Sequence, residues 1–587
     1  MMLRSDHAAP YPMAAPADAG AGAREVEWQL AAPDLSEVRR WLDQHDAWDG
    51  LIIERLPTQQ LHDTYLDTED WRVFRAGFAL RLREKAGHTE ATLKGLHSAR
   101  EDIADRRELT EPVPNGRAGA LAHATGPVGS RVHDVAGPKP LRTLFEVRTS
   151  RQRFAVRSRN PAAEVGEIAL DEAQFSRADG QRRPMLLARV ELEATGPDIA
   201  PLRRLMERLR TECDLRPATE NKFAVGLRTA SLHPPRPRDP RPNAEPEPAL
   251  TDASTRAGDF AAAALRRLLD DWHAHEPAAR LGETPEGLHA LRVTGRRMET
   301  ILGLFCPYLS PSVGKKGRLR LKSLLSALGA VRDVDIRLEA VSRFRGRLPE
   351  VDRRALDPLL RHLESERAAA RSRMLRALDA KPTRRWLETL PDQLARTPSR
   401  RSATARNAAA LDVVPDLIRV RYRKLRKCAR RLSPDSSLGE YHKVRVRTKK
   451  LRYALEVIAP AYGKPAADML SALHKLQSNL GIQHDSDVLA QYLTGLARRP
   501  PAGLGGETLF LMGRMAEQHA RAAARISGKV AKPWRKVRGR HWKAFRSRVK
   551  ELRGGASGGG GGTRGESGMS ASAVRSGGSA VPEAGGG

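Results

Sequence analysis

The sequence predicts an α+β protein with two domains, a β-rich domain followed by an all-α domain. Short segments that alternate polar and apolar residues, such as GFALRLREK and LARVELEA, fill the first part of the chain. This alternation is typical of strands with two unlike faces. Segments rich in Leu, Arg and Ala, with apolar residues three and four positions apart, fill the second part and predict amphipathic helices. A Pro-rich stretch between them predicts a linker.

Composition also sets the expected boundaries. The chain of 587 residues is too long for one hydrophobic core. We expect the β-rich domain at 24–229, the linker at 230–255 and the helical domain at 256–553. A disordered N-terminus at 1–23 and a Gly/Ser-rich tail at 554–587 complete the expected organisation, because low-complexity segments form no core.

Charge and cysteine content narrow the class of partner and the compartment. Lys and Arg number 102 against 70 Asp and Glu, a net charge of +32. Such an excess fits nucleic acid, an anionic membrane surface or an inorganic polyanion, and it does not determine the fold. Cys213, Cys306 and Cys428 match no zinc or disulfide spacing, which predicts reduced thiols. Without a signal-peptide core or an apolar run of roughly 18 residues, the expected location is the cytoplasm.

Charged residues of the first domain are sorted by strand face. Residues two apart on a strand point to the same side, so paired charges share a face. The pairs are Glu25 and Glu27, Arg81 and Arg83, Arg151 and Arg153, and Glu191 and Glu193. Paired carboxylates suit a divalent cation, and guanidinium groups suit phosphate oxygens. A polar face that is simply solvated explains the alternation equally well, so both interpretations remain open on this pattern alone.

A series of motifs resembles the CYTH family, the triphosphate tunnel metalloenzymes. The segments EVEWQL, YLDTEDWRVFRAGFALRLREK, ATLK, RRELTEPV, EIALDEAQF, ARVELEA and NKFAVGL follow one another in the family's order. The resemblance covers nearly all of the first domain. It implies an eight-stranded antiparallel β-barrel, with the charged faces inward, that hydrolyses or cyclises triphosphate compounds.

The CYTH resemblance also implies residue roles, with Mg²⁺ or Mn²⁺ as cofactor. Implied metal ligands are Glu25, Glu27, Asp171, Glu191 and Glu193. Substrate-binding residues are Arg81, Arg83, Lys94, Arg153 and Lys222, to which we add Arg151 because it shares a face with Arg153. Expected catalytic residues are Glu25, Glu27, Lys94 and Arg153. Gln29 departs from the family pattern, because it stands at the lysine position of the ExExK motif. An amide carries no charge, which puts the turnover rate in question.

The second domain contains a repeated basic helix. Each copy has basic residues at offsets of zero, three and seven, which form one stripe along a helix. The copies are His289, Arg292 and Arg296, and His442, Arg445 and Lys449, with Arg452 three positions further on. The segments SALGAVRDVD (326–335) and SNLGIQHDSD (478–487) follow at nearly the same separation, which predicts an internal duplication.

A basic stripe is usually a solvated face, but two copies that face each other would build a groove for a polyanion. The two histidines would add charge at mildly acid pH. Four aspartates of the repeated segments are interpreted as caps or as ion-pair partners that orient the arginines. They are Asp333, Asp335, Asp485 and Asp487.

LHALRVTGRRM, YHKVRVRTKKLR and the two LG-x-x-[RH]-D segments resemble the CHAD family. The resemblance covers about 256–550 and implies a helical bundle of two four-helix halves, with an internal two-fold repeat, that binds inorganic polyphosphate. It implies that the histidines, arginines and lysine of the two copies, Arg452 included, bind polyphosphate. Other basic residues were expected to extend the groove, namely Lys315, Lys316, Arg318, Arg320, Lys322 and the segment 533–550.

The leading hypothesis is a metal-dependent enzyme that hydrolyses triphosphate or polyphosphate ends in the barrel, while the helical domain captures the chain. Such a protein could associate with polyphosphate granules. A weakly catalytic or non-catalytic polyphosphate-binding protein is the first alternative, which Gln29 favours. A nucleic-acid binder is the second, although only 5% of the residues are aromatic and no zinc-finger or RNP signature occurs. A nucleotide or thiamine triphosphate also remains open as substrate.

Overall fold

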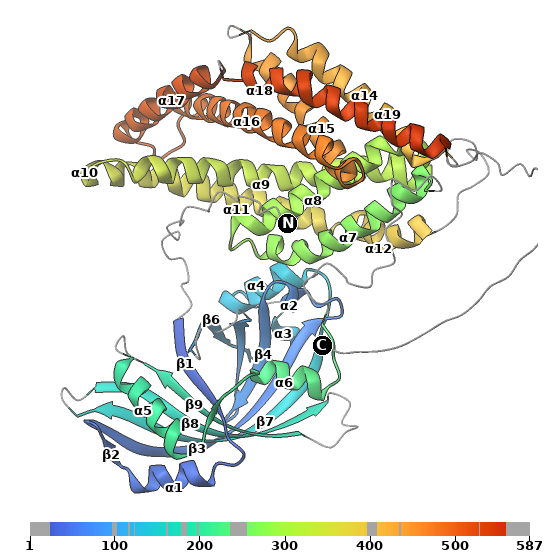
Figure 1. Ribbon diagram of the computed structural model, residues 1–587. Helices are drawn as coiled ribbons and strands as arrows, with labels where there is room; N and C mark the ends of the chain where they lie inside the picture. Colours follow the sequence, from blue (N-terminus) through green and yellow to red (C-terminus); the bar gives the residue numbers. More distant parts are fainter. Residues whose placement is uncertain are drawn as a thin grey trace, which may run out of the picture.

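The computed structural model describes two domains, a β-rich domain and a helical domain, which Figure 1 shows one above the other. The described residues are 24–96, 103–114, 118–121, 124–159, 163–177, 185–195, 199–234, 255–395, 408–433, 436–527 and 529–558. The expected disordered N-terminus, most of the expected linker and most of the expected tail therefore lie outside the described residues. The last helix runs to Gly558, past the expected start of the tail at residue 554.

Within the described residues, ten strands form one antiparallel sheet. They run in the order β10-β1-β6-β5-β4-β3-β7-β8-β9, with β2 beside β3 and an additional pairing of β1 with β9. The strands are β1 (Arg24–Ala31), β2 (Ala47–Trp48), β3 (Leu51–Thr68), β4 (Phe78–Lys85), β5 (His88–Gly95), β6 (Ile103–Pro112), β7 (Leu141–Ser158), β8 (Ala163–Arg177), β9 (Met185–Ala194) and β10 (Arg216–Pro217). The expected closed barrel of eight strands is therefore corrected to a ten-stranded sheet. Two of the strands are only two residues long, too short to give a periodic signal.

The two faces of the sheet differ as the alternation predicts. Trp28, Val190 and Leu192 lie on the apolar outer face and are at most 1% exposed. They pack in one core with residues of α1 (Ser36–Gln44) and α5 (Ala200–Glu212), and each such side chain stabilises the fold by about 2 kcal/mol. The opposite, inner face carries the charged residues and is therefore where a site is expected.

Four further short helices cover other parts of the sheet. They are α2 (Arg72–Arg75), α3 (Ala118–Leu121), α4 (Pro127–Ala136) and α6 (Lys222–Thr229). Leu80 and Leu82 of β4 pack under α4, against Val128 and Val132. This contact leaves the residues that alternate with the two leucines on the inner face.

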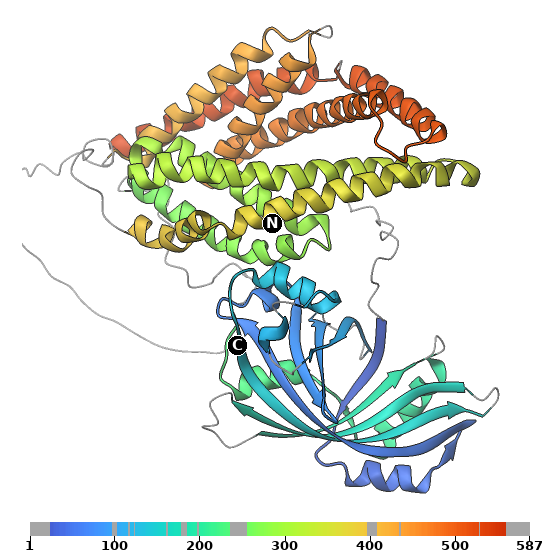
Figure 2. The same ribbon diagram turned by 180° about the vertical axis from the view of Figure 1, so that it is seen from behind.

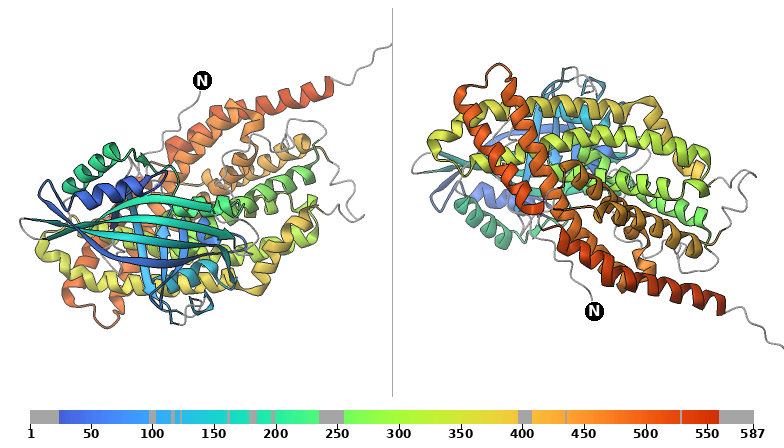
Figure 3. Two further views of the ribbon diagram at one scale, coloured as in Figure 1. Left: turned by 90° about the horizontal axis from the view of Figure 1, so that it is seen from below. Right: turned by 90° about the horizontal axis from the view of Figure 1, so that it is seen from above.

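Helices, most of them long, make up the second domain, as predicted. They are α7 (Ala257–Leu281), α8 (Pro285–Leu304), α9 (Arg318–Arg345), α10 (Glu350–Arg353), α11 (Asp357–Asp379), α12 (Lys381–Ala395), α14 (Ala410–Ala429), α15 (Leu438–Tyr462), α16 (Lys464–Arg498), α17 (Gly506–Ser527), α18 (Ala531–Lys536) and α19 (Trp542–Gly558). A capping box of Ser437 and Glu440 begins α15. Seen from below and above, α19 extends beyond the β-rich domain (Figure 3). No described helix combines the length and apolar character that crossing a bilayer requires.

The two domains contact each other through α4 and α7, which lie side by side in both opposed views (Figures 1 and 2). Arg131 Nε lies 2.9 Å from a carboxylate oxygen of Glu283. Asp134 accepts from Arg371 Nη2 at 2.7 Å, and its backbone carbonyl accepts from Arg280 at 3.4 Å. Arg280 is 0% exposed, so its position is fixed by these contacts.

Candidate functional site

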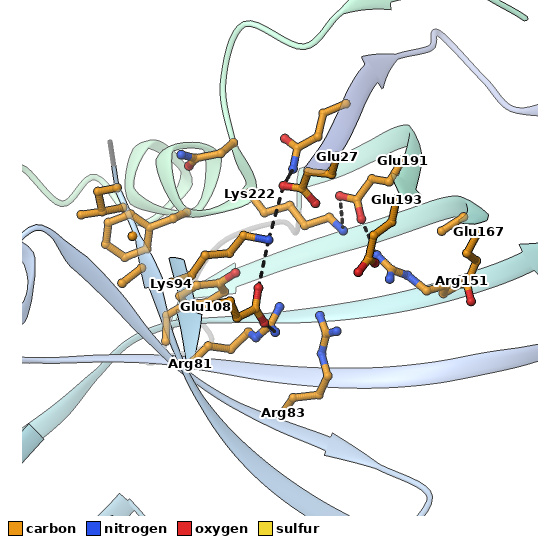
Figure 4. A pocket seen from close by; sticks show the side chains of 18 residues that line it. Glu27, Arg81, Arg83, Lys94, Glu108, Arg151, Glu167, Glu191, Glu193 and Lys222 are labelled. Carbon is orange, nitrogen blue, oxygen red and sulfur yellow. Dashed lines mark hydrogen bonds and ion pairs between the residues drawn. The ribbon is translucent and has the colours of Figure 1, made fainter. Parts of the chain in front are cut away.

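A cavity of about 260 Å³ lies on the inner face of the sheet. Charged side chains from several strands and from α6 point into it (Figure 4). Basic groups come from β4, β5, β7 and α6, and carboxylates come from β1, β6, β8 and β9. The charged lining residues are Glu27, Arg81, Arg83, Lys94, Glu108, Arg151, Glu167, Glu191, Glu193 and Lys222.

Arg81 and Arg83 point into this cavity because they alternate with Leu80 and Leu82 on β4. Arg83 donates two hydrogen bonds to Asp63, of 2.7 and 2.8 Å. Burial works to raise the pKa of Asp63, but Arg81 and Arg83 lower it to about 2. Arg81 Nε is buried and has no hydrogen-bond partner among the described residues. The guanidinium of Arg81 is therefore only partly satisfied by the described residues.

Lys94 and Lys222 complete the basic side of the cavity. Lys94 Nζ lies 3.3 Å from a carboxylate oxygen of Glu27 and 3.3 Å from one of Glu108. Lys222 is the first residue of α6, whose cap, Asn221, accepts a hydrogen bond from a backbone N–H of the helix at 2.8 Å. The cap fixes the start of α6 and therefore the direction in which Lys222 enters the cavity.

Glu27, Glu193 and Glu167 form a row of carboxylates across three neighbouring strands. Glu27 of β1 lies directly opposite Glu193 of β9, and Glu193 lies directly opposite Glu167 of β8. Like charges in directly opposite positions repel each other. Burial, together with Glu27 and other carboxylates nearby, raises the pKa of Glu193. The row is therefore a concentration of negative charge that a cation would stabilise.

Asp171 and Glu191 are held by ion pairs beside this row. Asp171 is 0% exposed and accepts two hydrogen bonds from Arg151, both of 2.7 Å. Lys222 also contacts Asp171, and its Nζ lies 3.0 Å from Glu191. Although burial works to raise it, Lys222 and Arg151 hold the pKa of Glu191 well below its usual value. Asp171, expected to be a metal ligand, lies behind the cavity, where it orients the cations.

The structure brings most of the predicted residues together. Those that line the cavity are Glu27, Arg81, Arg83, Lys94, Arg151, Glu191, Glu193 and Lys222. Arg153 does not line it and instead donates a hydrogen bond of 2.8 Å to Glu167. Glu25 belongs to β1, but its side chain lies outside the described residues.

Sequence reasoning missed Glu108, Glu167, Tyr65 and Asn221, all of which line the cavity. The signal for Glu167 was present, because it shares a strand face with Asp171 in EIALDEAQF. Glu108 lies in RRELTEPV, one of the motifs that carry the resemblance. Tyr65 could be found only from the fold, since its ring stacks on Phe145 at 4.7 Å.

The carboxylate row fits a divalent cation. Glu27, Glu193 and Glu167 offer only oxygen donors, which are the ligands that Mg²⁺ and Mn²⁺ take. Burial and then Glu27 raise the pKa of Glu193, and a cation beside these side chains would oppose both effects. The described residues contain no group of three His, Cys, Asp or Glu already placed as a metal cage. Lys94 holds Glu27 at 3.3 Å instead, so metal binding has to release Glu27 from this lysine.

Gln29 is held in place by a neighbouring acid and base. Its amide nitrogen donates a hydrogen bond of 2.7 Å to Glu27, and its amide oxygen accepts one of 3.3 Å from Arg189. Arg189 is 2% exposed, and burial lowers its pKa. A positive group is therefore present next to Gln29, although the residue itself carries no charge.

Gln29→Lys is expected to lower the free energy of unfolding by about 1–3 kcal/mol, because it places a second cation beside buried Arg189 and removes the acceptor of a part-buried hydrogen bond. Arg189→Gln in the same chain should restore part of this loss. Urea unfolding of both single variants and the double variant measures the coupling. Gln60→Lys, at an exposed position of β3, is the control for adding a charge. A Gln29→Lys variant as stable as Gln60→Lys would contradict this arrangement.

A second charged site lies between the two repeats of the helical domain. His289 and His442 each lie four residues after the first residue of their helices, α8 and α15. Burial, followed by the charge of Arg332 on α9, lowers the pKa of His289. The ring of His442 lies 4.8 Å from that of His484 on α16. Arg332 and His484 occupy the same position of the two repeated segments, so the histidines have equivalent neighbours.

The arginines of the two repeats also have equivalent neighbours. Arg445 Nη2 lies 3.4 Å from Asp485. Burial lowers the pKa of Arg292, and Asp333 is the acid that most opposes this effect. Asp333 and Asp485 therefore lie near the arginines, as interpreted from the sequence. The other two aspartates have different partners, Arg367 at 2.7 Å for Asp335 and Gln491 for Asp487.

Charged residues of the two repeats lie close enough to act on one another. We call this group, which consists of His289, Arg292, Arg296, His442, Arg445, Lys449 and His484, the dyad groove. Burial, followed by the charge of Arg445 on α15 and then by those of Arg292 and Arg296 on α8, lowers the pKa of Lys449 to about 8. Arg445 Nε is buried and has no hydrogen-bond partner among the described residues. Burial, with Arg445 and His442, lowers the pKa of His484 to about 4. Added charge at mildly acid pH was expected at His289 and His442, and at His289 burial and Arg332 oppose it by lowering the pKa.

Some predicted basic residues lie elsewhere. Arg452 donates a hydrogen bond of 2.7 Å to Gln477 and pairs with Glu456, so the structure does not bring it together with the dyad groove. Arg318 lies near Arg421, whose pKa burial and Arg318 lower to about 10. The segment 533–550 forms part of α18 and α19 and lines a separate cavity.

The two charged sites lie in two domains of different fold. Family models match both domains: the CYTH domain at residues 38–227 and the CHAD domain at residues 263–494. The chain therefore carries a CYTH domain followed by a CHAD domain. The sequence resemblances to both families are confirmed.

Solved structures resemble each part separately. A crystal structure of the CHAD domain from the plant Ricinus communis has 25% identity and a TM-score of 0.40, and covers 50% of this chain and 96% of its own. PptA from Streptomyces chartreusis has 20% identity and a TM-score of 0.38, over 48% of this chain and 100% of its own. A putative adenylyl cyclase from Hippeastrum, described as having a dominant triphosphatase activity, has 20% identity and a TM-score of 0.27, over 35% of this chain and 95% of its own. No curated protein matches the chain.

Proposed function

We propose that the β-rich domain is a metal-dependent phosphohydrolase acting on inorganic triphosphate or on the ends of polyphosphate, and that the helical domain holds the polyphosphate chain. The observation that carries this proposal is the division of the inner-face cavity. Basic residues from four elements line it together with a row of carboxylates. A cavity with both signs of charge suits a polyanion bound through a cation.

The basic residues would bind the substrate and stabilise the reaction. Arg81, Lys94 and Arg151, which line the cavity, would bind phosphate oxygens. Phosphoryl transfer spreads negative charge over the oxygens of the transferred group, and fixed cations at that position lower the barrier. Asp171, Asp63 and Asn221 would hold Arg151, Arg83 and Lys222 in position before the substrate arrives. Groups that are already in position when the substrate arrives stabilise the transition state more than additional charge would.

Glu27, Glu193 and Glu167 are the residues that would hold Mg²⁺ or Mn²⁺. When bound, the ion would neutralise phosphate oxygens and orient the attacking water. The side chains themselves would keep a negative region that faces the basic side of the cavity, so that the cation and the phosphates bind on different sides. Release of Glu27 from Lys94 would also free this lysine for the substrate.

The dyad groove would capture the polyphosphate chain. After burial, Arg296 lowers the pKa of Arg292, and Arg445, Arg292 and Arg296 lower that of Lys449, so positive charges of both repeats act on Lys449. A chain of phosphates would relieve this repulsion by placing negative charge beside these cations. Tethered to the β-rich domain, the captured chain would present its ends to the inner-face cavity at raised local concentration.

Polyphosphate affinity is expected to fall as pH rises through about 8. The pKa of Lys449 is lowered to about 8 in the free protein by burial, Arg445, Arg292 and Arg296, with Asp485 opposing them. Above this pH the free protein has lost the proton, and binding has to restore it before the lysine can contact phosphate. Titrations at fixed salt between pH 6.5 and 9.5 measure the effect. Lys449→Arg should flatten the profile, because a guanidinium stays charged over this range. A wild-type profile as flat as that of Lys449→Arg would contradict the assignment.

A substrate panel on the full chain tests the proposed function. Triphosphate, pyrophosphate, ATP, thiamine triphosphate and long-chain polyphosphate are compared, with Mg²⁺, Mn²⁺ or EDTA, by release of inorganic phosphate. We expect release from triphosphate and polyphosphate that depends on added metal. Binding of polyphosphate without turnover of any substrate would favour the weakly catalytic alternative, in which the neutral Gln29 limits the reaction. Displacement of polyphosphate by duplex DNA at equal phosphate and fixed salt would favour a nucleic-acid binder.

A further inference from the structure

A second cavity of about 520 Å³ lies in the helical domain, between the end of α14, the start of α15, α16 and the segment Val530–Arg538. We call it the C-terminal cavity. The CHAD family model ends at residue 494, so one wall of this cavity comes from a part of the chain that the family model does not include. The two α15 residues that line it, Tyr441 and Val444, are neither members of the basic stripe nor part of the dyad groove.

Apolar side chains form the floor of the C-terminal cavity. Tyr441, Leu476 and Trp534 line it, and they are 2%, 0% and 7% exposed. Tyr441 donates its hydroxyl hydrogen bond to the backbone oxygen of Ser433 at 2.9 Å, which fixes the ring. These side chains pack in the hydrophobic core and show a small part of their surface, the largest from Trp534, to a space of the size that small-molecule sites have.

Arginines form the rim. Arg430, Arg535 and Arg538 line the cavity, and no acidic residue lines it within the described part of the chain. None of the three makes an ion pair with another described residue. Arg426 adds positive charge nearby. Like Arg538 of the rim, it opposes the rise in the pKa of Tyr422 that burial causes. A rim of unpaired guanidinium groups attracts an anion with several charges.

We infer that the C-terminal cavity binds a small organic phosphate with a planar aromatic ring, such as a nucleoside diphosphate or triphosphate. The ring would lie against Trp534 and Tyr441, and the phosphates would bind Arg430, Arg535 and Arg538. Aromatic rings and guanidinium groups side by side are the combination by which proteins hold a nucleotide without reading its base edge. This site is separate from the one in which a triphosphate would be hydrolysed.

Calorimetric titration of the full chain with ADP, in EDTA to prevent turnover, tests the inference. Trp534→Leu and the pair Arg535→Ala with Arg538→Ala are each expected to weaken ADP binding about tenfold or more. Trp534→Phe keeps an aromatic ring and should retain most of the affinity, which separates stacking from a general packing defect. Arg81→Ala in the inner-face cavity and Arg445→Ala in the dyad groove should leave this binding event unchanged. Pyrophosphate, which has the charges but no ring, should bind at least tenfold more weakly than ADP.

Several results would overturn the inference. Pyrophosphate that binds as tightly as ADP would show a simple anion site. ADP binding that Arg81→Ala or Arg445→Ala removes and Trp534→Leu spares would place the nucleotide in one of the other two sites. The absence of any binding at millimolar ADP would show that the cavity is a packing feature alone. Because all of these titrations are done without turnover, the outcome does not depend on whether the β-rich domain hydrolyses triphosphate.

Discussion

Glu193→Gln is expected to lower metal-dependent phosphate release by about 100-fold or more while the fold stays intact. The side chain lies in the middle of the carboxylate row, between Glu27 and Glu167. An amide of the same shape removes one ionic oxygen donor from the proposed cation site. Phosphate release from triphosphate, measured over a range of Mg²⁺ and Mn²⁺ concentrations, checks the effect.

The stability of this variant separates a functional role from a structural one. The pKa of Glu193 is raised in the folded protein by burial and by its acidic neighbours. The folded state therefore binds this proton more tightly than the unfolded state, so stability falls as pH rises from the usual pKa of glutamate through the folded value. At neutral pH the folded protein bears the full free-energy cost of this buried negative charge. Glutamine carries no charge and removes that cost. The free energy of unfolding at pH 7 should be equal to or above that of the wild type.

Glu54→Gln is the matched control for Glu193→Gln. Glu54 is an exposed glutamate of β3 that pairs with Arg157 at 3.0 Å and does not line the cavity. It should change neither turnover nor stability by a measurable amount. Turnover of Glu193→Gln above one tenth of the wild-type rate, or a loss of activity that comes with a clear loss of stability, would contradict the proposed role.

Arg292→Ala and Arg445→Ala are each expected to weaken polyphosphate binding about tenfold or more, and by similar factors. They occupy equivalent positions of α8 and α15, and each has an acidic neighbour at an equivalent position of the next helix. A charge-assisted hydrogen bond to a phosphate is worth about 1.5–3 kcal/mol, which corresponds to about tenfold or more in affinity. Titration with long-chain polyphosphate at several salt concentrations should also show a smaller salt dependence for each variant, since each removes one phosphate contact.

Arg521→Ala provides the control for these two variants. Arg521 is an exposed residue of α17 that pairs with Glu517 at 2.5 Å, so the same change is made far from the dyad groove. It should leave the affinity within about twofold of the wild type. If one repeat carried all of the binding and the other none, so that Arg292→Ala and Arg445→Ala differed strongly, the shared groove would be wrong.

Local periodicity predicted which residues share a face, but it could not predict how far along a strand each residue lies from the site. Glu27 and Glu193 were predicted as ligands, and the register of β1 and β9 places them opposite each other. Asp171 and Glu167 share a face of β8, yet Asp171 is paired with Arg151 behind the cavity, while Glu167 lines it. Which of the two reaches the cavity depends on register with neighbouring strands and on α6, which are contacts between distant segments.

The helical domain was easier to predict, because the repeat carries the information twice. The matched offsets in the two copies correctly indicated that Arg292 and Arg445 have equivalent surroundings. For Arg452, helical spacing alone does not show that Gln477 and Glu456 contact its guanidinium group, and its role in binding stays a prediction. The contact of Asp134 with Arg371 between the domains left no sequence signal at all, since charged residues are frequent throughout this chain.

The most direct test of the account is the kinetics of the doubly substituted chain, Arg292→Ala with Arg445→Ala, on a short and a long substrate. If the helical domain captures and the β-rich domain cleaves, KM for long-chain polyphosphate should rise about tenfold or more, while kcat and KM for triphosphate stay at wild-type values. Equal changes for triphosphate and long-chain polyphosphate, or no change for either, would contradict the proposed division of labour between the two domains.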